Sequence, residues 1–392
     1  MSMLSQTYIG KYYEGSQELS VSTKSIPGQD NDSYVILGES GYGKSVAAQS
    51  IVLQKAYQGH RILDLNIHNT SSSEHIFPIL RKAFEQLSSK IDAYNTPIPT
   101  TLFNPLRYAD GTTESSADLS YTLSNIITKY IKLSRTETAA FSDSLEYVIS
   151  NLDDNPDIFP AILKTLDEFD TKASRSASAH LAPLLRHNVF RNQPIKRHSG
   201  IEIINLSKFP PLFQKVIADL LLFDEFRTAS QGGQPPRYIY IDEMQNLSID
   251  KDCYLGKILT EGRKYSLNVI LASQSIREFN ASERTMLCQA NHKLLFHPAL
   301  LEVMISHLIT PQNMADKFMK FIETMDMSYS YKPVLLKAIY EYMDTSGRVA
   351  LPDVVDYFID FYEDRKLTRE DWLHIVDVCD KSLEKYYLRL KK

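Results

Sequence analysis

The feature that most limits the fold is the segment GESGYGKS, which runs from Gly38 to Ser45 and has the spacing GxxxxGK[ST]. It follows a short β-prone run at residues 34–37, and the residues after it have apolar side chains at helical spacing as far as Gly59. A strand, a glycine loop and a helix in this order let backbone N–H groups and the positive end of the helix surround a phosphate. The segment therefore predicts a phosphate-binding loop, the Walker A motif.

Each position of this loop has a separate predicted task. We expect Lys44 to reach the β and γ phosphates of a nucleotide, and the Ser45 hydroxyl to bind Mg²⁺. ATP and Mg²⁺ are therefore the expected cofactors. The residues expected to contact the nucleotide are Gly38, Glu39, Ser40, Gly41, Tyr42, Gly43, Lys44, Ser45 and Val46.

A second apolar run, residues 238–241, ends in the carboxylates of Asp242 and Glu243, as in a Walker B motif. In a P-loop protein such carboxylates lie beside the phosphates, so we expect Asp242 to hold Mg²⁺ and Glu243 to orient or deprotonate the attacking water. A third run, residues 268–272, leads to Gln274 at the same edge of the sheet. Gln274 is the predicted sensor of the γ-phosphate or of the water.

Arg263 lies in the segment EGRK, between these two apolar runs. An arginine at this place can act as a finger that stabilises the transition-state charge in a neighbouring subunit. It can equally be an exposed arginine at the end of a helix. Spacing alone does not separate the two interpretations.

Residues 186–197 form a basic stretch without any acidic residue, and it contains His187 and Phe190. Its charged residues are Arg186, Arg191, Lys196 and Arg197. Clustered cations beside an aromatic ring are typical of nucleic-acid contacts. A solvated connecting loop has the same composition, so both interpretations stay open.

Composition limits the remaining classes of function. Hydrophobic residues make up 43% of the 392 residues, and the net charge is −5, which does not exclude DNA because only the lining of a pore needs to be basic. The three cysteines have no metal-binding spacing. No apolar run is long enough for a membrane span or a secretory signal, so we expect a cytoplasmic protein.

The pattern as a whole predicts an α/β fold, a RecA-like P-loop NTPase with a parallel sheet and helices on both faces. The strands are expected at residues 34–37, 61–65, 201–206, 238–241, 268–272 and 294–296. Between residues 69 and 200 no clear strand is visible. The predicted domains are a hairpin and the first part of the ATPase core at 1–68, a helical insertion at 69–200, the second part of the core at 201–298, and a C-terminal helical region at 299–392.

Five segments together resemble the HerA/FtsK superfamily of hexameric pumping ATPases. They are ILGESGYGKS, ILDLN, IEIINLSKFP, YIYIDEMQNL and EGRKYSLNVILASQS, in that order. The likeness runs from Ile9 to about Phe296 and is closest to the HerA branch and to the motor domains of conjugative coupling and type IV secretion ATPases. Only 33 residues precede Tyr34, so the N-terminal barrel usual in HerA proteins is not expected, and the residues after Ile9 look like a short hairpin.

The resemblance implies the same roles for Lys44, Ser45, Asp242, Glu243 and Gln274 as the residues suggest. It also implies that Arg263 acts across a subunit interface, in a homo-hexameric ring with nucleotide between neighbours and DNA or another polymer in the centre.

Three functions follow as alternatives. The first is a motor that translocates or remodels DNA. The second is an ATPase that acts on a protein substrate in secretion or assembly. The third is a nucleotide-regulated scaffold of an anti-phage defence complex, in which a partner effector protein supplies the further chemistry.

Overall fold

The computed structural model of this chain describes residues 5–14, 17–25, 31–39, 41–68, 76–108, 110–152, 157–193, 200–232, 236–274 and 278–296. It also describes six isolated residues, Ala338, Glu341, Tyr342, Asp353, Asp356 and Tyr357. The chain divides into two units, residues 1–10 with 22–308, and residues 11–21 with 309–392. Apart from the six isolated residues, the predicted C-terminal region at 299–392 lies outside the described residues.

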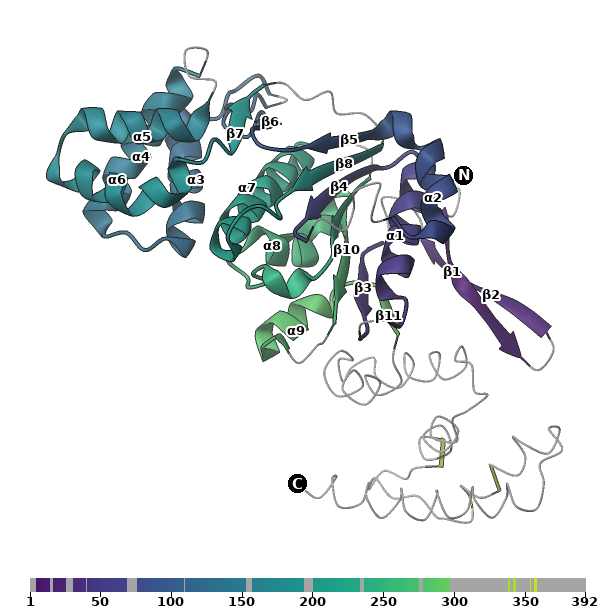
Figure 1. Cartoon of the computed structure of the whole chain (residues 1–392). Helices are drawn as coiled ribbons and strands as arrows, with labels where there is room; N and C mark the ends of the chain where they lie inside the picture. Colours follow the sequence, from purple (N-terminus) through teal and green to yellow (C-terminus); the bar gives the residue numbers. More distant parts are fainter. Residues whose placement is uncertain are drawn as a thin grey trace. The chain divides into compact units, whose positions relative to one another are not determined.

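A seven-stranded sheet forms the centre of the described structure (Figure 1). Its strand order is β11-β3-β10-β9-β4-β8-β5, and neighbouring strands are parallel. The strands are β3 (Tyr34–Leu37), β4 (Arg61–Asn66), β5 (Ile91–Tyr94), β8 (Gly200–Asn205), β9 (Arg237–Ile241), β10 (Leu267–Ser273) and β11 (His292–Leu295). The predicted parallel sheet is thus confirmed.

The register of the three strands β3, β10 and β9 brings their carboxyl ends to one edge of the sheet. Ser273 in β10 lies opposite Leu37 in β3, and Leu271 lies opposite Ile241 in β9. The loop after Leu37 and the carboxylates after Ile241 therefore leave the sheet at the same edge. This edge is called the carboxyl edge below, and the opposite one the amino edge.

Helices cover both faces of the sheet, as predicted. On one face Tyr34 and Ile36 pack in a core with α1 (Lys44–Tyr57), beside α2 (Pro78–Gln86). On the other face Val35 and Leu37 belong to a larger core. That core includes α7 (Pro211–Ser230), α8 (Tyr254–Glu261) and α9 (Ala281–Leu287). The division follows from the alternation of side chains along a strand.

Four further helices lie between β4 and β8 in the chain and pack against one another as a bundle (Figure 1). They are α3 (Ser116–Tyr130), α4 (Arg135–Ser150), α5 (Ile158–Phe169) and α6 (Lys172–Leu185). Side chains cap three of them, and the clearest case is a capping box between Ser134 and Glu137 at the start of α4. No helix of the described residues is long and apolar enough to cross a membrane.

The expectation of no strand between residues 69 and 200 is wrong. Strand β5 extends the main sheet beside β8, and β6 (Ile98–Thr100) pairs with β7 (Phe190–Asn192) in a small parallel sheet. These strands have three or four residues, and β5 lies half-buried at the edge of the sheet. Such short segments lack the continuous apolar run that reveals a buried strand in a sequence.

At the N-terminus, where the sequence predicts a short hairpin, β1 (Ser5–Glu14) and β2 (Gln17–Ser25) form a two-stranded sheet. Side chains of α1 hold β1. Gln54 Nε2 donates to the Tyr8 carbonyl oxygen at 2.7 Å, and the Tyr8 N–H donates to Gln54 Oε1 at 2.7 Å. Helix α1 is thereby joined to the first half of β1.

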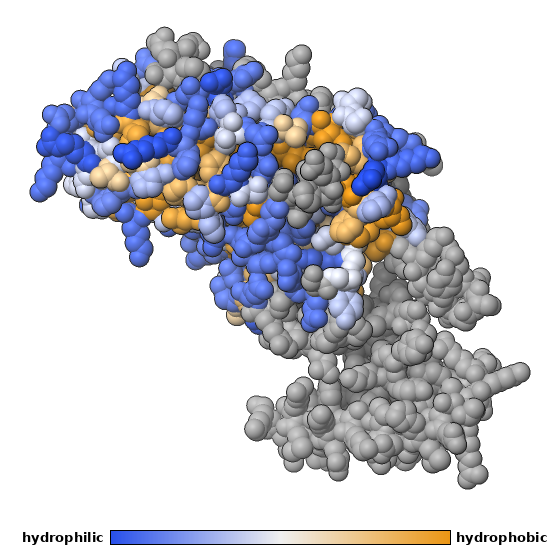
Figure 2. Space-filling view, in the orientation of Figure 1, coloured by the Kyte–Doolittle hydropathy of each residue, from blue (hydrophilic) through white to orange (hydrophobic). Residues whose placement is uncertain are grey.

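The surface of the described structure carries single exposed apolar residues. Ile79 in α2 is 81% exposed, and Tyr121 in α3 is 64% exposed. On the face drawn in Figure 2, hydrophobic colour shows near α1 and α2, while hydrophilic residues cover much of the bundle. Scattered exposed apolar residues are normal on protein surfaces, so they identify no binding surface.

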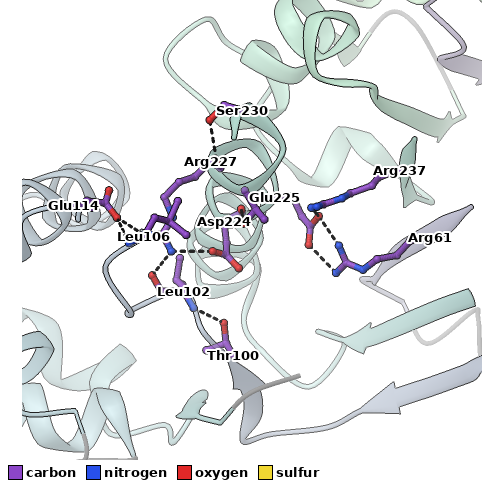
Figure 3. Close-up of polar contacts among 11 residues, drawn as sticks. Arg61, Thr100, Leu102, Leu106, Glu114, Asp224, Glu225, Arg227, Ser230 and Arg237 are labelled. Atoms are coloured by element: carbon purple, nitrogen blue, oxygen red, sulfur yellow. Dashed lines mark hydrogen bonds and ion pairs between the residues drawn. The ribbon is translucent and has the colours of Figure 1, made fainter. Parts of the chain in front are cut away.

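A buried network of charges joins the amino edge of the sheet to α7 (Figure 3). Arg61, the first residue of β4, binds both oxygens of Glu225 at 2.8 Å and donates from Nε to Glu202 at 2.8 Å. Arg237, the first residue of β9, donates to Glu225 at 3.2 Å. Burial alone would lower the pKa of Arg61, but Glu225 and Glu202 raise it above its ordinary value. The four side chains therefore form one charged unit.

We expect Glu225→Ala to lower the free energy of unfolding by about 3–5 kcal/mol, because it leaves Arg61 and Arg237 buried without their shared carboxylate. Urea unfolding followed by circular dichroism measures this. The matched control is Glu168→Ala, which removes the exposed partner of Lys164 and should cost less than about 0.5 kcal/mol. Equal costs for the two variants would contradict the interpretation.

Candidate active site

The loop between β3 and α1 has the conformation that its glycines allow. Gly41 and Gly43 both have φ of 89°, in the left-handed region, and Gly43 is the N-cap of α1. The N–H of Gly38 donates to the Ser273 carbonyl oxygen at 3.2 Å, which ties the start of the loop to the end of β10. The loop thus opens directly into the amino end of a helix, where backbone N–H groups favour an anion. Ser40 lies outside the described residues.

Lys44 of the phosphate loop lies close to both predicted carboxylates, Asp242 and Glu243. Its side chain is buried, and Nζ donates to Glu243 Oε1 at 2.9 Å. The same nitrogen lies 3.9 Å from Asp242 Oδ1. The structure therefore brings together the loop lysine and both carboxylates, as the sequence analysis expects.

Asp242 lies against the first turn of α1. Its Oδ1 accepts from the Glu243 N–H at 3.0 Å, and its carboxyl group is hydrogen-bonded to Ser45. Burial raises the pKa of Asp242, and the charge of Glu243 adds to the rise, while Lys44 opposes it. A cation at this place would therefore stabilise the ionised form.

The oxygen donors of Ser45 and Asp242 fit the preference of Mg²⁺ for hard ligands. Among the described residues no group of three or more His, Cys, Asp or Glu side chains could hold a metal ion. In proteins Mg²⁺ commonly uses one or two carboxylates together with phosphate oxygens.

Glu243 has a left-handed backbone conformation, and both oxygens of its side chain accept hydrogen bonds. Its φ of 56° is left-handed, which costs a residue other than glycine on the order of 1–3 kcal/mol and is common at functional sites. Oε1 accepts from Lys44 and from Gln274 Nε2 at 3.1 Å, and Oε2 accepts from Gln245. Burial alone would raise the pKa of Glu243, but the hydrogen bonds from Lys44, Gln245 and Gln274 lower it. Glu243 is thus held as a carboxylate.

The structure adds residues that the sequence analysis does not name. Gln245 donates to Glu243 and accepts from the Ser273 hydroxyl at 2.8 Å. Asn246 donates to the Glu243 carbonyl oxygen at 3.0 Å, and its amide nitrogen lies 2.9 Å from His68 Nε2. The polar pair Gln245 and Asn246, two and three positions after Glu243, is the one signal in the sequence that could have revealed these contacts.

Arg263 lies at the other edge of the sheet from the loop of its own chain. It belongs to η3 (Gly262–Tyr265), which precedes β10, whereas Ser273 at the far end of β10 contacts the loop. The seven residues of β10 span about 20 Å at roughly 3.3 Å per residue. Arg263 is exposed and does not reach this site within one chain.

The basic stretch is only partly described. Arg186 is exposed after α6, and Arg191 Nε donates to Asp157 Oδ1 at 2.9 Å. Phe190 is fully buried and contacts the rings of Phe103 and Phe159, so it cannot stack on a base in this structure. Lys196 and Arg197 lie outside the described residues. Nucleic-acid contact by this stretch stays a prediction.

The sequence matches no protein-family model and no curated protein. The structure is similar to that of VirB4 of Thermoanaerobacter pseudethanolicus, with a TM-score of 0.55 and 16% identity over 72% of this chain and 82% of the VirB4 chain. The chain has the fold of a P-loop ATPase. At this identity the similarity establishes the fold alone.

The plasmid coupling protein TrwB in complex with the ATP analogue ADPNP aligns with a TM-score of 0.46 and 15% identity, over 68% of this chain and 70% of TrwB. The similar structures are thus those of VirB4 and of a plasmid coupling protein, and the sequence motifs resemble the motor domains of type IV secretion and conjugative coupling ATPases.

The close packing at Gly38 gives a test of the loop. A Cβ at this position would lie 2.7 Å from the Cβ of Phe296, just after β11. We expect Gly38→Ala to lower the stability by about 1–3 kcal/mol, because an added methyl group displaces Phe296. Thermal unfolding measures this, and the cost should be smaller in a Phe296→Gly background, where the opposing Cβ is gone. The same cost in both backgrounds would contradict the contact.

Proposed function

We propose that the protein is an ATP-hydrolysing motor of the HerA/FtsK type that acts as a homo-hexamer and translocates or remodels DNA. The observation that carries the proposal is the meeting of Lys44 with Glu243 at 2.9 Å and with Asp242 at 3.9 Å. Groups for binding phosphate, for holding a cation and for activating water lie together at the carboxyl edge. The VirB4-like fold supports the ATPase part of the proposal.

In this proposal the loop binds the triphosphate of ATP. The N–H groups around Gly43 and the start of α1 surround the phosphates, and Lys44 moves from Glu243 to the β and γ phosphates. Ser45 and Asp242 would hold Mg²⁺. When bound, the metal ion neutralises charge on the phosphate oxygens.

Glu243 has the role of the base. Its carboxylate accepts a proton from the water as the water oxygen bonds to the γ-phosphorus, and the bond from that phosphorus to the bridging oxygen breaks, giving ADP and phosphate. Gln274 bonds the same oxygen, Oε1, at 3.1 Å. It is therefore placed to bind the water or the γ-phosphate once Lys44 has turned away.

The placement of Arg263 supports action between subunits. Because it lies at the amino edge, it is too far from the loop of its own chain, and it becomes useful to catalysis only when a neighbouring chain presents its carboxyl edge. A head-to-tail ring provides this arrangement. The number of six subunits and the DNA in the centre of the ring are proposed from the resemblance of the motifs to the HerA/FtsK superfamily.

An ATPase that acts on a protein substrate is the second candidate. Phe190 is buried, so the basic stretch loses the aromatic residue that favoured nucleic acid. Stimulation of hydrolysis by a protein partner, and none by DNA, would support this candidate. Slow turnover together with assembly that depends on nucleotide would instead support the third alternative, a nucleotide-regulated scaffold.

The central test is the rate of ATP hydrolysis with and without single- and double-stranded DNA. We expect DNA to stimulate the wild type, and Glu243→Gln to lower kcat by about 10²-fold or more while nucleotide still binds, since only the base is lost. Lys44→Ala should lose nucleotide binding itself, measured by calorimetry. Unchanged hydrolysis by Glu243→Gln would overturn its role, and a wild type indifferent to every DNA would overturn the translocase.

The role of Arg263 between subunits has its own test. We expect Arg263→Ala and Glu243→Gln each to be nearly inactive alone. Their mixture should recover activity, because some interfaces then pair an intact Glu243 with an intact Arg263 from the neighbour. Hydrolysis by the mixture at the mean of the two separate rates, under conditions where subunits exchange, would show that Arg263 does not act across the interface.

A further inference from the structure

We propose that Gln245, anchored by Ser273, is a positioning residue that determines which oxygen of the Glu243 carboxylate faces the bound nucleotide. The inference rests on the proposed function, because it concerns the carboxylate that activates water. It adds two residues, Gln245 and Ser273, to the catalytic arrangement.

The amide of Gln245 has one orientation that satisfies both neighbours. An ionised carboxylate only accepts hydrogen bonds, so Nε2 must face Glu243 Oε2. The carbonyl oxygen Oε1 then faces the Ser273 hydroxyl, which donates to it at 2.8 Å. A flipped amide would place two acceptors against each other at Glu243. The two contacts therefore fix the direction of the side chain.

Ser273 is a rigid anchor. It is fully buried at the end of β10, in register with Leu37 of β3. Its carbonyl oxygen accepts from the Gly38 N–H at 3.2 Å. Ser273 thus binds the start of the phosphate loop through its backbone and Gln245 through its side chain. The positions of the loop and of the Glu243 carboxylate therefore both depend on Ser273.

Binding of a triphosphate explains why Glu243 needs this support. Its two oxygens have different partners, since Oε1 contacts Lys44 and Gln274 while Oε2 contacts Gln245. Phosphate oxygens compete for Lys44, and when Lys44 leaves, Glu243 loses its cationic partner. The bond from Gln245 then holds Oε2 away from the phosphates, and Oε1 keeps its direction toward the water.

The first test compares steady-state ATP hydrolysis by the wild type, Gln245→Ala and Gln245→Glu. We expect both variants to lower kcat by about 10- to 100-fold, the effect of losing a hydrogen bond to a charged group, while KM changes less than about twofold. Gln245→Glu keeps the length of the side chain but has no amide donor. Gln231→Ala, at the end of α7 and far from the site, is the matched control and should match the wild type.

The second test is a double-mutant cycle with Ser273→Ala. If Ser273 acts through Gln245, Ser273→Ala lowers kcat less than Gln245→Ala does. The double variant is then no slower than Gln245→Ala alone. Thermal unfolding shows that each variant folds. A kcat unchanged by Gln245→Ala, a loss confined to KM, or effects of the two residues that multiply would each overturn the proposal.

The third test does not depend on turnover. A crystal structure of the wild type with Mg²⁺ and a non-hydrolysable ATP analogue should show Lys44 on the phosphates and Gln245 still bonded to Glu243. Glu243 without this contact in such a complex would overturn the proposal. A wild type that hydrolyses no ATP would instead refute the proposed function, whereas normal hydrolysis by Gln245→Ala refutes only the role of Gln245.

Discussion

The parallel pairing of β3, β10 and β9 is the constraint on which the site depends. Strands that run in the same direction end at the same edge, and the register places Leu37 opposite Ser273 and Leu271 opposite Ile241. Lys44 and Glu243, 199 positions apart in the chain, thereby come within hydrogen-bonding distance. Because these strands are buried on both faces, their register cannot slip without moving apolar side chains into the wrong layer.

The balance of buried positive and negative side chains differs between the two edges of this sheet. At the carboxyl edge, the Lys44 ammonium faces both Asp242 and Glu243, so negative charge is in excess, which favours a further cation there. At the amino edge the buried charges are matched. Arg61 and Arg237 share the carboxylate of Glu225, Arg61 also binds Glu202, and Asp32 accepts hydrogen bonds from Lys55 and Tyr238. The carboxyl edge can therefore gain a cation, whereas the charges at the amino edge already neutralise one another.

Much of this arrangement could be predicted from the sequence, because its signals are local. The apolar runs at six strands are nearly continuous, and the spacing of the phosphate loop identifies Lys44 and Ser45 without a structure. Asp242 and Glu243 come directly after one of these apolar runs, so their place at the end of a strand could be predicted in the same way. These predictions need only the knowledge that the strands are parallel.

The remaining features depend on contacts between distant segments. The role of Gln245 requires that β10 lie next to β9, so that Ser273 is within reach, and no spacing in the sequence states that order. Strand β5 is too short and too exposed to show a pattern. Phe190 looked available to a nucleic acid because its neighbours are basic, yet the rings of Phe103 and Phe159 enclose it.

The charged unit around Glu225 also restricts how this chain can diverge. Arg61, Glu202, Glu225 and Arg237 come from three strands and one helix, and replacing one of them alone by an apolar residue unbalances two cations against two carboxylates. Intermediates with one replacement carry an uncompensated ion in the interior. Replacing the four positions by apolar residues therefore costs the fold less stability when they change together than when they change one at a time.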